Sequence, residues 1–204
     1  MIIVSNFVYT KGLYNLINSL VLYYKSSFND SINLYKNINM NNLDQIKMII
    51  DNLKTEYVLS MIPGNVVVTS MITSFFIYKF TESQFRKNGL SINKLKPFAE
   101  WHIGDIFAAI AIALVSIGII LKSRDISLGM YILNSSLIAG VFLFTILGIS
   151  ITVYFLTRKF KISKFMVTII VILTFMMQFG NVFLFLGISD SIINFRKLKY
   201  KNKA

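Results

Sequence analysis

The sequence lacks cysteine altogether and contains one histidine, two prolines and only nine acidic residues. Without cysteine the chain can form no disulfide, no thiolate nucleophile and no thiolate metal site. Zinc and haem centres draw on His or Cys ligands, and the single His102 supplies too few of them for a zinc site. We therefore expect the protein to hold no metal and no cofactor.

Charge of either sign is scarce. Charged residues make up 15% of the chain and hydrophobic residues 55%, with a mean hydropathy of +0.64. A soluble domain carries about 25% charged residues, so too few remain here to cover a globular surface. The composition predicts an integral membrane protein. The heavy use of Lys, Asn, Ile and Phe is typical of an AT-rich bacterial genome, so we expect a multi-pass protein of a bacterial plasma membrane.

The net charge of +12 comes from 21 Lys and Arg against nine Asp and Glu. In a soluble protein this excess would indicate nucleic-acid binding. Here the basic residues flank apolar runs, so we interpret them as anchors that face anionic lipid headgroups. The expected partner is the lipid bilayer, and we expect no nucleic acid.

Four segments are long and apolar enough to cross a bilayer, which needs about 20 mainly apolar residues. They lie at about 57–78, 103–121, 131–157 and 165–189. The one charged residue inside them is Asp105, in the first turn of the second segment, where the helix dipole favours an anion. The fold class predicted is all-α, a polytopic transmembrane helical bundle with four spans, forming a single membrane domain over residues 1–204.

Two further segments have helical patterns. Residues 1–24 are apolar but carry Lys11 near their middle, and a central Lys costs about 2.5–3.5 kcal/mol on insertion scales. This segment is either a fifth, partial span or a helix lying in the membrane interface. Residues of about 42–55 have an apolar stripe, which predicts an amphipathic loop helix.

Uncharged polar residues recur at helical spacing inside two of the spans. Lipid offers them no hydrogen-bond partners, so we expect them to face the bundle interior or to line a ligand cavity. The first set is Asn65, Thr69 and Thr73, and the second is Thr174, Gln178 and Asn181. In the first turns of the 57–78 segment, Pro63-Gly64 either marks a simple boundary or breaks its helix beside a binding site.

Catalytic constellations are missing from the spans. Gly148-Ile149-Ser150 matches part of a membrane serine-protease motif, but no histidine lies within a span to act as its base. No pair of carboxylates and no Gly-rich phosphate loop is present. We therefore expect that the protein is not an enzyme.

The end of the last span carries a motif, Gly-x-x-Asp-x-x-x-x-Phe-Arg, at Gly187, Asp190, Phe195 and Arg196. In this motif, and more loosely over most of its length, the chain resembles the YybS-type family of predicted bacterial membrane proteins. The resemblance implies no established biochemical function. It also implies further spans ahead of Met1, so the chain is expected to be shortened at its N-terminus. The helical pattern is remotely similar to substrate-capture subunits of vitamin uptake systems and to a cell-shape membrane protein.

The motif also has a local physical interpretation. Gly187 would end the membrane helix, and Ser189 or Asp190 would cap a short helix that follows. The three basic residues Arg196, Lys197 and Lys199 would then reach anionic lipid headgroups. Asp190 and Arg196 would not share a helix face.

Two classes of function remain open. One is a small-molecule uptake (substrate-binding) subunit, which would rely on an ATPase partner because the spans hold no ionisable residue beyond their ends. The other is a non-enzymatic membrane scaffold or cell-envelope assembly protein that recruits a partner. The first requires a cavity of at least about 300 Å³, whereas the second requires an exposed patch and no cavity.

Overall fold

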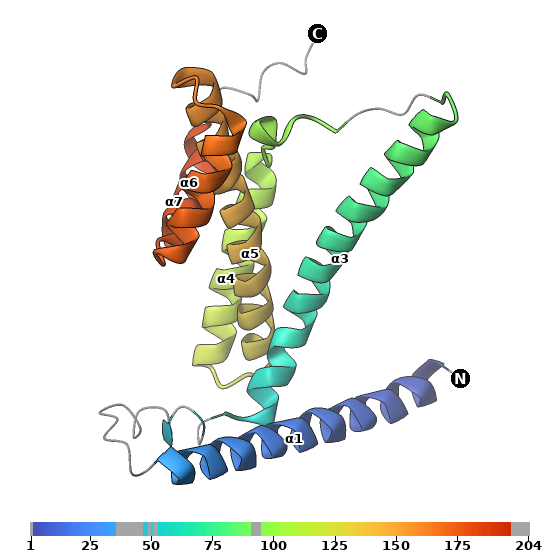
Figure 1. Ribbon diagram of the computed structural model, residues 1–204. Coiled ribbons are helices and arrows are strands. Elements are labelled where there is room, and N and C mark those ends of the chain that lie inside the picture. Colours follow the sequence, from blue (N-terminus) through green and yellow to red (C-terminus); the bar gives the residue numbers. More distant parts are fainter. Residues whose placement is uncertain (1, 36–46, 49, 51–52, 91–94, 197–204) are drawn as a thin grey trace. The chain divides into compact units, whose positions relative to one another are not determined.

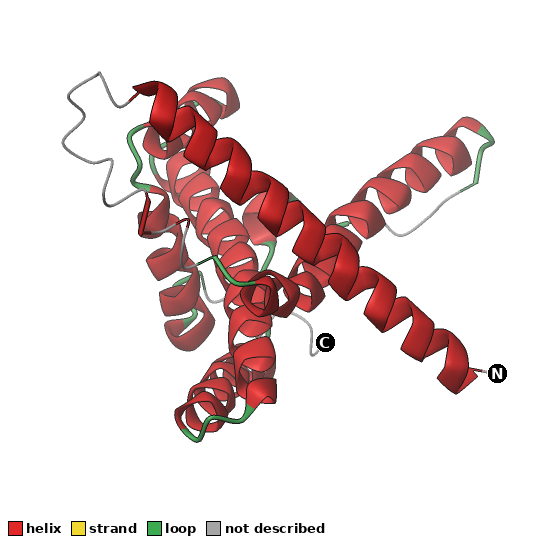
Figure 2. Ribbon diagram, turned by 90° about the horizontal axis from the view of Figure 1, so that it is seen from below, coloured by secondary structure: helices red, strands yellow, loops and turns green. Residues whose placement is uncertain are grey.

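The computed structural model describes residues 2–35, 47–48, 50, 53–90 and 95–196, and in these ranges every regular element is a helix (Figures 1 and 2). The chain divides into two compact units, Met1–Ile62 and Pro63–Ala204. The helix α3 (Thr55–Lys87) contributes to both. The all-α prediction is confirmed.

The first unit contains the helix α1 (Ile2–Tyr35) and the beginning of α3. Thr55 donates a hydrogen bond to the Asn18 side chain at 2.8 Å, and Tyr14 donates one to Glu56 at 3.4 Å. The prediction for residues 1–24 is right in being helical, but α1 runs well past residue 24. It does not belong to the described helices that are apolar enough to cross a membrane. The predicted loop helix at about 42–55 lies largely outside the described residues.

The second unit is built around the helix α5 (Ser127–Tyr154), which continues into the single π-helical turn η2 (Phe155–Lys159). The helices α4 (Asp105–Ser123) and α7 (Gly180–Ile193) pack on α5 (Figure 1). Their shared apolar core holds the buried side chains of Ala108, Phe144 and Leu147. Asp105 stands in the first turn of α4, as the sequence predicts.

Three described helices are long and apolar enough to cross a membrane, namely α3, α4 and α5 with η2. They correspond to the first three predicted spans. α3 extends about nine residues beyond its predicted end, and ion pairs at helical spacing accompany this extension. Glu82 lies 2.9 Å from Lys79 and 3.5 Å from Arg86.

The fourth predicted span is not one helix. Residues 165–189 divide into α6 (Lys164–Met176) and α7, which meet at an angle of 113°. At about 1.5 Å per residue each is shorter than the hydrocarbon core, so the pair counts as one broken span or as a re-entrant loop. The break has a definite local cause. Gln178 has a left-handed backbone conformation with φ 62°. Its N–H donates a hydrogen bond to the Phe175 carbonyl, and the N–H of Phe179 donates one to the Thr174 carbonyl. These two bonds close α6 as a Schellman motif.

Close backbone approach joins α5 to α7 through two glycines. A Cβ placed on Gly148 would overlap the carbonyl oxygen of Phe183, and one on Gly187 would overlap that of Phe144. Only glycine permits helices to approach so closely. Gly187 was predicted to end the membrane helix, and that prediction is wrong, because the residue lies inside α7 at its contact with α5.

The Pro63-Gly64 pair does not break its helix, because α3 continues through both residues. Pro63 is exposed, whereas Gly64 is buried and a Cβ there would lie 2.8 Å from the backbone of Ser135 on α5. The pair therefore marks a close helix contact and not a helix boundary.

Candidate functional site

Residues 95–104 form the last part of the connection from α3 to α4, and we call them the pocket wall because most of them line the pocket described below. The wall contains one 3₁₀ turn, η1 (Phe98–Glu100), which follows Pro97. Proline fixes its own φ and favours extended backbone before it, so it suits the start of such a turn. The Trp101 indole donates a hydrogen bond to the Lys96 carbonyl at 3.0 Å, which fixes the ring against the wall.

Arg196 reaches the pocket wall because α7 ends in a left-handed residue. Asn194 adopts φ 53° and its N–H bonds the Asp190 carbonyl at 2.8 Å. Asparagine tolerates this conformation better than most residues. The chain reverses there and brings Arg196 back onto the helix it has just left.

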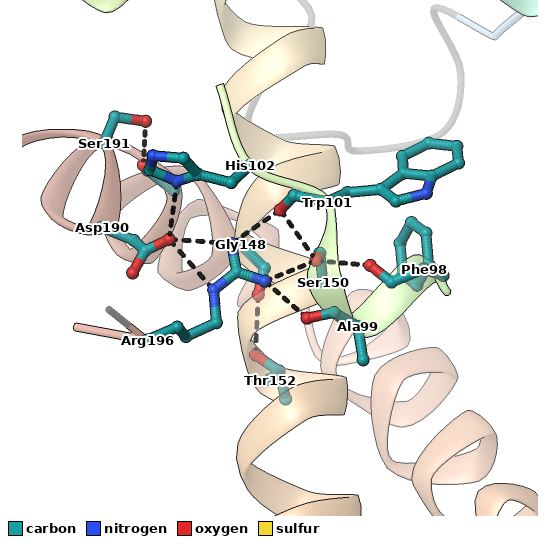
Figure 3. A network of polar contacts seen from close by, with 11 residues as sticks. Phe98, Ala99, Trp101, His102, Gly148, Ser150, Thr152, Asp190, Ser191 and Arg196 are labelled. Carbon is teal, nitrogen blue, oxygen red and sulfur yellow. Dashed lines mark hydrogen bonds and ion pairs between the residues drawn. The ribbon is translucent and has the colours of Figure 1, made fainter. Parts of the chain in front are cut away.

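Arg196 and Asp190 form a buried ion pair (Figure 3). The guanidinium donates to one carboxylate oxygen, Oδ2, from Nε at 3.1 Å and from Nη2 at 2.8 Å. The two side chains are 0% and 2% exposed. The prediction that Arg196 reaches lipid headgroups is therefore wrong, as is the prediction that Asp190 caps a following helix. Lys197 and Lys199, its predicted companions, lie outside the described residues.

The remaining donors of Arg196 bind the pocket wall and α5. Nη1 donates to the Ala99 carbonyl at 2.7 Å and to the Ser150 hydroxyl at 2.8 Å, and Nη2 donates to the Trp101 carbonyl at 2.7 Å. A guanidinium has five N–H donors, and these five bonds use all of them. We call Arg196, Asp190, Ser150, His102 and the carbonyls of Ala99 and Trp101 the Arg196 network.

Ser150 joins α5 to the same wall. Its hydroxyl donates to the Phe98 carbonyl at 2.6 Å, with the Trp101 carbonyl at 3.2 Å, while it accepts from Arg196. Its proton is therefore directed at backbone, and the serine of the partial protease motif has a positioning role in this geometry.

His102 lies at the edge of the network, beside Asp190. Its Nδ1 lies 3.6 Å from Asp190 Oδ2, and its side chain is 12% exposed. The second carboxylate oxygen, Asp190 Oδ1, accepts no hydrogen bond from the described part of the chain. The network is thus a buried pair of opposite charges whose main contacts are with backbone carbonyls.

A pocket of about 850 Å³ lies on the other side of the wall. It is bounded by α3 at Met71, Ile72 and Phe75, by the wall itself, and by α5 at residues 142–147. Small-molecule sites span about 300–1,000 Å³ and are lined mainly by apolar and aromatic side chains. This pocket has both properties.

Aromatic rings gather at the wall side of the pocket. The Trp101 ring meets Phe75 at 5.6 Å and Phe98 at 5.1 Å between centroids, both edge to face. Such pairs contribute about 0.5–1.5 kcal/mol beyond their buried area. Trp101 is the single tryptophan of the chain.

Three polar side chains also line the pocket: Lys96, Glu100 and His102. Glu100 pairs with Arg158, whose guanidinium lies 5.3 Å from the centre of the Tyr154 ring. Lys96 forms no ion pair within the described ranges. The lining of the pocket is therefore mainly apolar, with a few polar side chains on the pocket wall.

The polar residues predicted at helical spacing lie elsewhere. Asn65, Thr69, Thr73, Gln178 and Asn181 are exposed on the described chain, and Thr174 is half-buried with its hydroxyl bonded to the Ile170 carbonyl. None of the six lines the pocket. Because α6 ends at Met176, the second set does not share one helix face.

Most residues of the motif at the end of the last span are buried, in contrast to these polar residues. Gly187, Asp190 and Arg196 are buried, and Phe195 is 47% exposed. The structure brings Asp190 and Arg196 together although they share no helical face. Sequence reasoning missed Ser150, Trp101 and His102 as their neighbours. A serine within an otherwise apolar stretch of α5 was the available signal, but its partners lie 46 or more residues away.

No curated protein and no solved structure matches the chain. Residues 1–191 match DUF2232, a family described as a predicted membrane protein. The match covers the helices of both units and ends just after Asp190. Together with the apolar helices α3, α4 and α5, it establishes that this chain belongs to the DUF2232 family of predicted membrane proteins.

Proposed function

We propose that the protein is a non-enzymatic, small-molecule-binding subunit of a bacterial plasma membrane, of the uptake type, and that its ligand occupies the pocket beside Trp101. The observation that carries the proposal is the pocket itself, which is large, mainly apolar and lined by four aromatic rings, three of which are in mutual contact through Trp101. Its volume exceeds the roughly 300 Å³ that a small-molecule site needs. The finer resemblance to the YybS-type family belongs to the same proposal.

The ligand expected from this lining has an apolar body. It would lie along Phe75, Leu143 and Ile146 and meet the ring of Trp101. Lys96 and His102 at the wall offer hydrogen bonds to a polar end. In pockets of this kind apolar surface gives most of the affinity, while a few polar groups fix the orientation.

The exposed polar residues favour a protein that works within a complex. Thr69 and Thr73 lie on the surface of α3, within a helix apolar enough to span a membrane. Polar groups at membrane depth need partners that lipid does not provide. A second membrane protein would provide them, as an uptake system with an ATPase requires. The scaffold function predicts the same surface, so ligand binding separates the two proposals.

The test is extraction of small molecules retained by the purified full-length protein, followed by mass spectrometry. Ile146→Phe fills part of the pocket, and Val141→Phe adds a similar volume at an exposed site on the same helix. We expect a molecule retained by the wild type and by Val141→Phe, and at least ten-fold less of it in Ile146→Phe. Equal retention by both variants, or an empty wild type that copurifies with envelope proteins, overturns the proposal in favour of the scaffold.

A further inference from the structure

We infer that Arg196 is the positioning residue of the pocket, holding the wall that carries Trp101 and coupling ligand occupancy to residues 194–196, which directly follow α7. The inference deepens the proposed function and names the regulation of the same site. It stands on the five hydrogen bonds of one buried side chain.

The wall needs an external support. Among its residues only Phe98–Glu100 form a regular turn, and three residues cannot pair all their own backbone carbonyls. The carbonyl of Ala99 is bonded by Arg196 at 2.7 Å, and that of Trp101 by Arg196 and Ser150. Buried carbonyls left without donors are destabilising. Removing the guanidinium therefore frees the wall to move.

Asp190 allows the charged guanidinium to be buried at this site. A guanidinium that is 0% exposed would be strongly disfavoured without a counter-charge. Asp190 neutralises it through one oxygen and leaves Nη1 entirely to Ala99 and Ser150. The carboxylate thus acts through Arg196, and the two should be sensitive to substitution together.

Arg196 comes from the segment beyond the last helix. Only the left-handed turn at Asn194 separates it from α7. A force or partner that displaces this segment withdraws the guanidinium from Ala99 and Trp101. By thermodynamic reciprocity, anything that holds Trp101 in place also holds Arg196 in place. Residues 194–196 and the pocket are therefore linked.

Arg158 provides a matched comparison on the same wall. It pairs with the side chain of Glu100, its own side chain is 54% exposed, and no bond from it to a wall carbonyl is present in the described ranges. An exposed ion pair of this kind contributes little to stability. Arg158→Gln thus removes a positive charge from the wall without removing its backbone support.

The first experiment measures acrylamide quenching of Trp101 in the full-length protein in lipid nanodiscs without added ligand. We expect the quenching constant to rise at least two-fold in Arg196→Gln and to stay at the wild-type value in Arg158→Gln. Arg196→Lys keeps the charge for Asp190 but has three donors instead of five, so it should give an intermediate value. If Arg196→Gln fails to fold, Arg196→Lys decides. A wild-type quenching constant in a folded Arg196 variant overturns the inference.

The second experiment tests the coupling from the pocket side. The chain has no cysteine, so Ser191→Cys, at a site 2% exposed beside Asp190, is a single reporter for alkylation by N-ethylmaleimide. Phe75→Ala removes the ring contact with Trp101 and should speed alkylation at least three-fold. Phe76→Ala, on a ring that is 63% exposed and does not line the pocket, should leave the rate unchanged. Equal rates in the two backgrounds overturn the coupling. Neither experiment uses a ligand, so both outcomes are independent of whether the pocket proves to be occupied.

Discussion

The α5–α7 contact and the polar stripe on α3 place polar residues in opposite ways. At the contact, Ser150, Asp190 and Arg196 are buried and bonded to one another (Figure 3). On α3, Asn65 and Thr69 recur at helical spacing and yet are exposed. Periodic polarity along a membrane helix thus does not identify the buried polar site of this protein, whereas a few residues distant in sequence form it.

The difference has a physical origin in backbone approach. Gly148 and Gly187 bring α5 and α7 so close that a side chain fits at neither position. The resulting contact excludes other partners and leaves the polar groups at its end to bond with each other. On the described part of α3, the comparable close contact is at Gly64, near the other end of α5. Beyond Gly64, the hydroxyl residues Thr69 and Thr73 of the stripe are exposed.

The largest effect is expected from breaking the Arg196–Asp190 pair. Asp190→Asn or Arg196→Gln alone leaves a buried charge without its partner, which costs about 3–5 kcal/mol in other proteins. The double variant removes both charges and should be more stable than the sum of the single losses predicts. The measurement is the free energy of unfolding in mixed micelles with added SDS. A buried pair would be contradicted if each single variant lost less than about 1 kcal/mol of unfolding free energy and the losses added up in the double variant. A loss of that size is what we expect for the exposed Arg158→Gln.

A smaller but clear effect is expected at the glycines of the same contact. Gly148→Ala and Gly187→Ala each place a methyl group on a carbonyl of the facing helix, so the helices must separate. Overpacking of this kind costs about 1–3 kcal/mol. The control is Gly140→Ala, because a Cβ at Gly140 meets nothing within 4 Å. Unfolding in the same micelles should separate the first two variants from the control, and equal stability of all three would refute the close contact.

The smallest effect is expected on the α3 stripe. Thr69→Val conserves shape and removes a hydroxyl from an exposed site, where substitutions usually change stability by less than about 0.5 kcal/mol. The isolated protein should therefore unfold as the wild type does. Any consequence should instead appear as weaker association with a membrane partner, measured by copurification. A large loss of stability in the isolated protein would mean that the stripe is buried after all.

The sequence predicts most of the span positions because long uncharged runs leave few alternatives. The predicted segments 57–78, 103–121 and 131–157 correspond to α3, α4 and α5 with η2. The fourth segment is predicted as one helix because residues 165–189 carry no charge, whereas α6 ends at a left-handed Gln178. Nothing in the local pattern of apolar residues distinguishes that glutamine from one in mid-helix.

The candidate site was predictable in part. Asp190 and Arg196 stood out as a charged motif at the end of a span, and both belong to the buried network. Their pairing was not predictable from helical spacing, because it depends on the reversal at Asn194. The pocket was not predictable at all, since it joins Phe75, Trp101 and Ile146 from three separate elements. A contact between residues so far apart in sequence leaves no periodic signal.

The fluorescence of Trp101 reports directly on whether a ligand occupies the pocket against the wall held by Arg196. Bound small molecules are first extracted from the purified protein. The extract is then titrated back into the stripped protein while the emission of this single tryptophan is recorded. The account predicts a saturable change in emission for the wild type and for Val141→Phe, and none for Ile146→Phe. The same change in Ile146→Phe, or no change in the wild type, would contradict it.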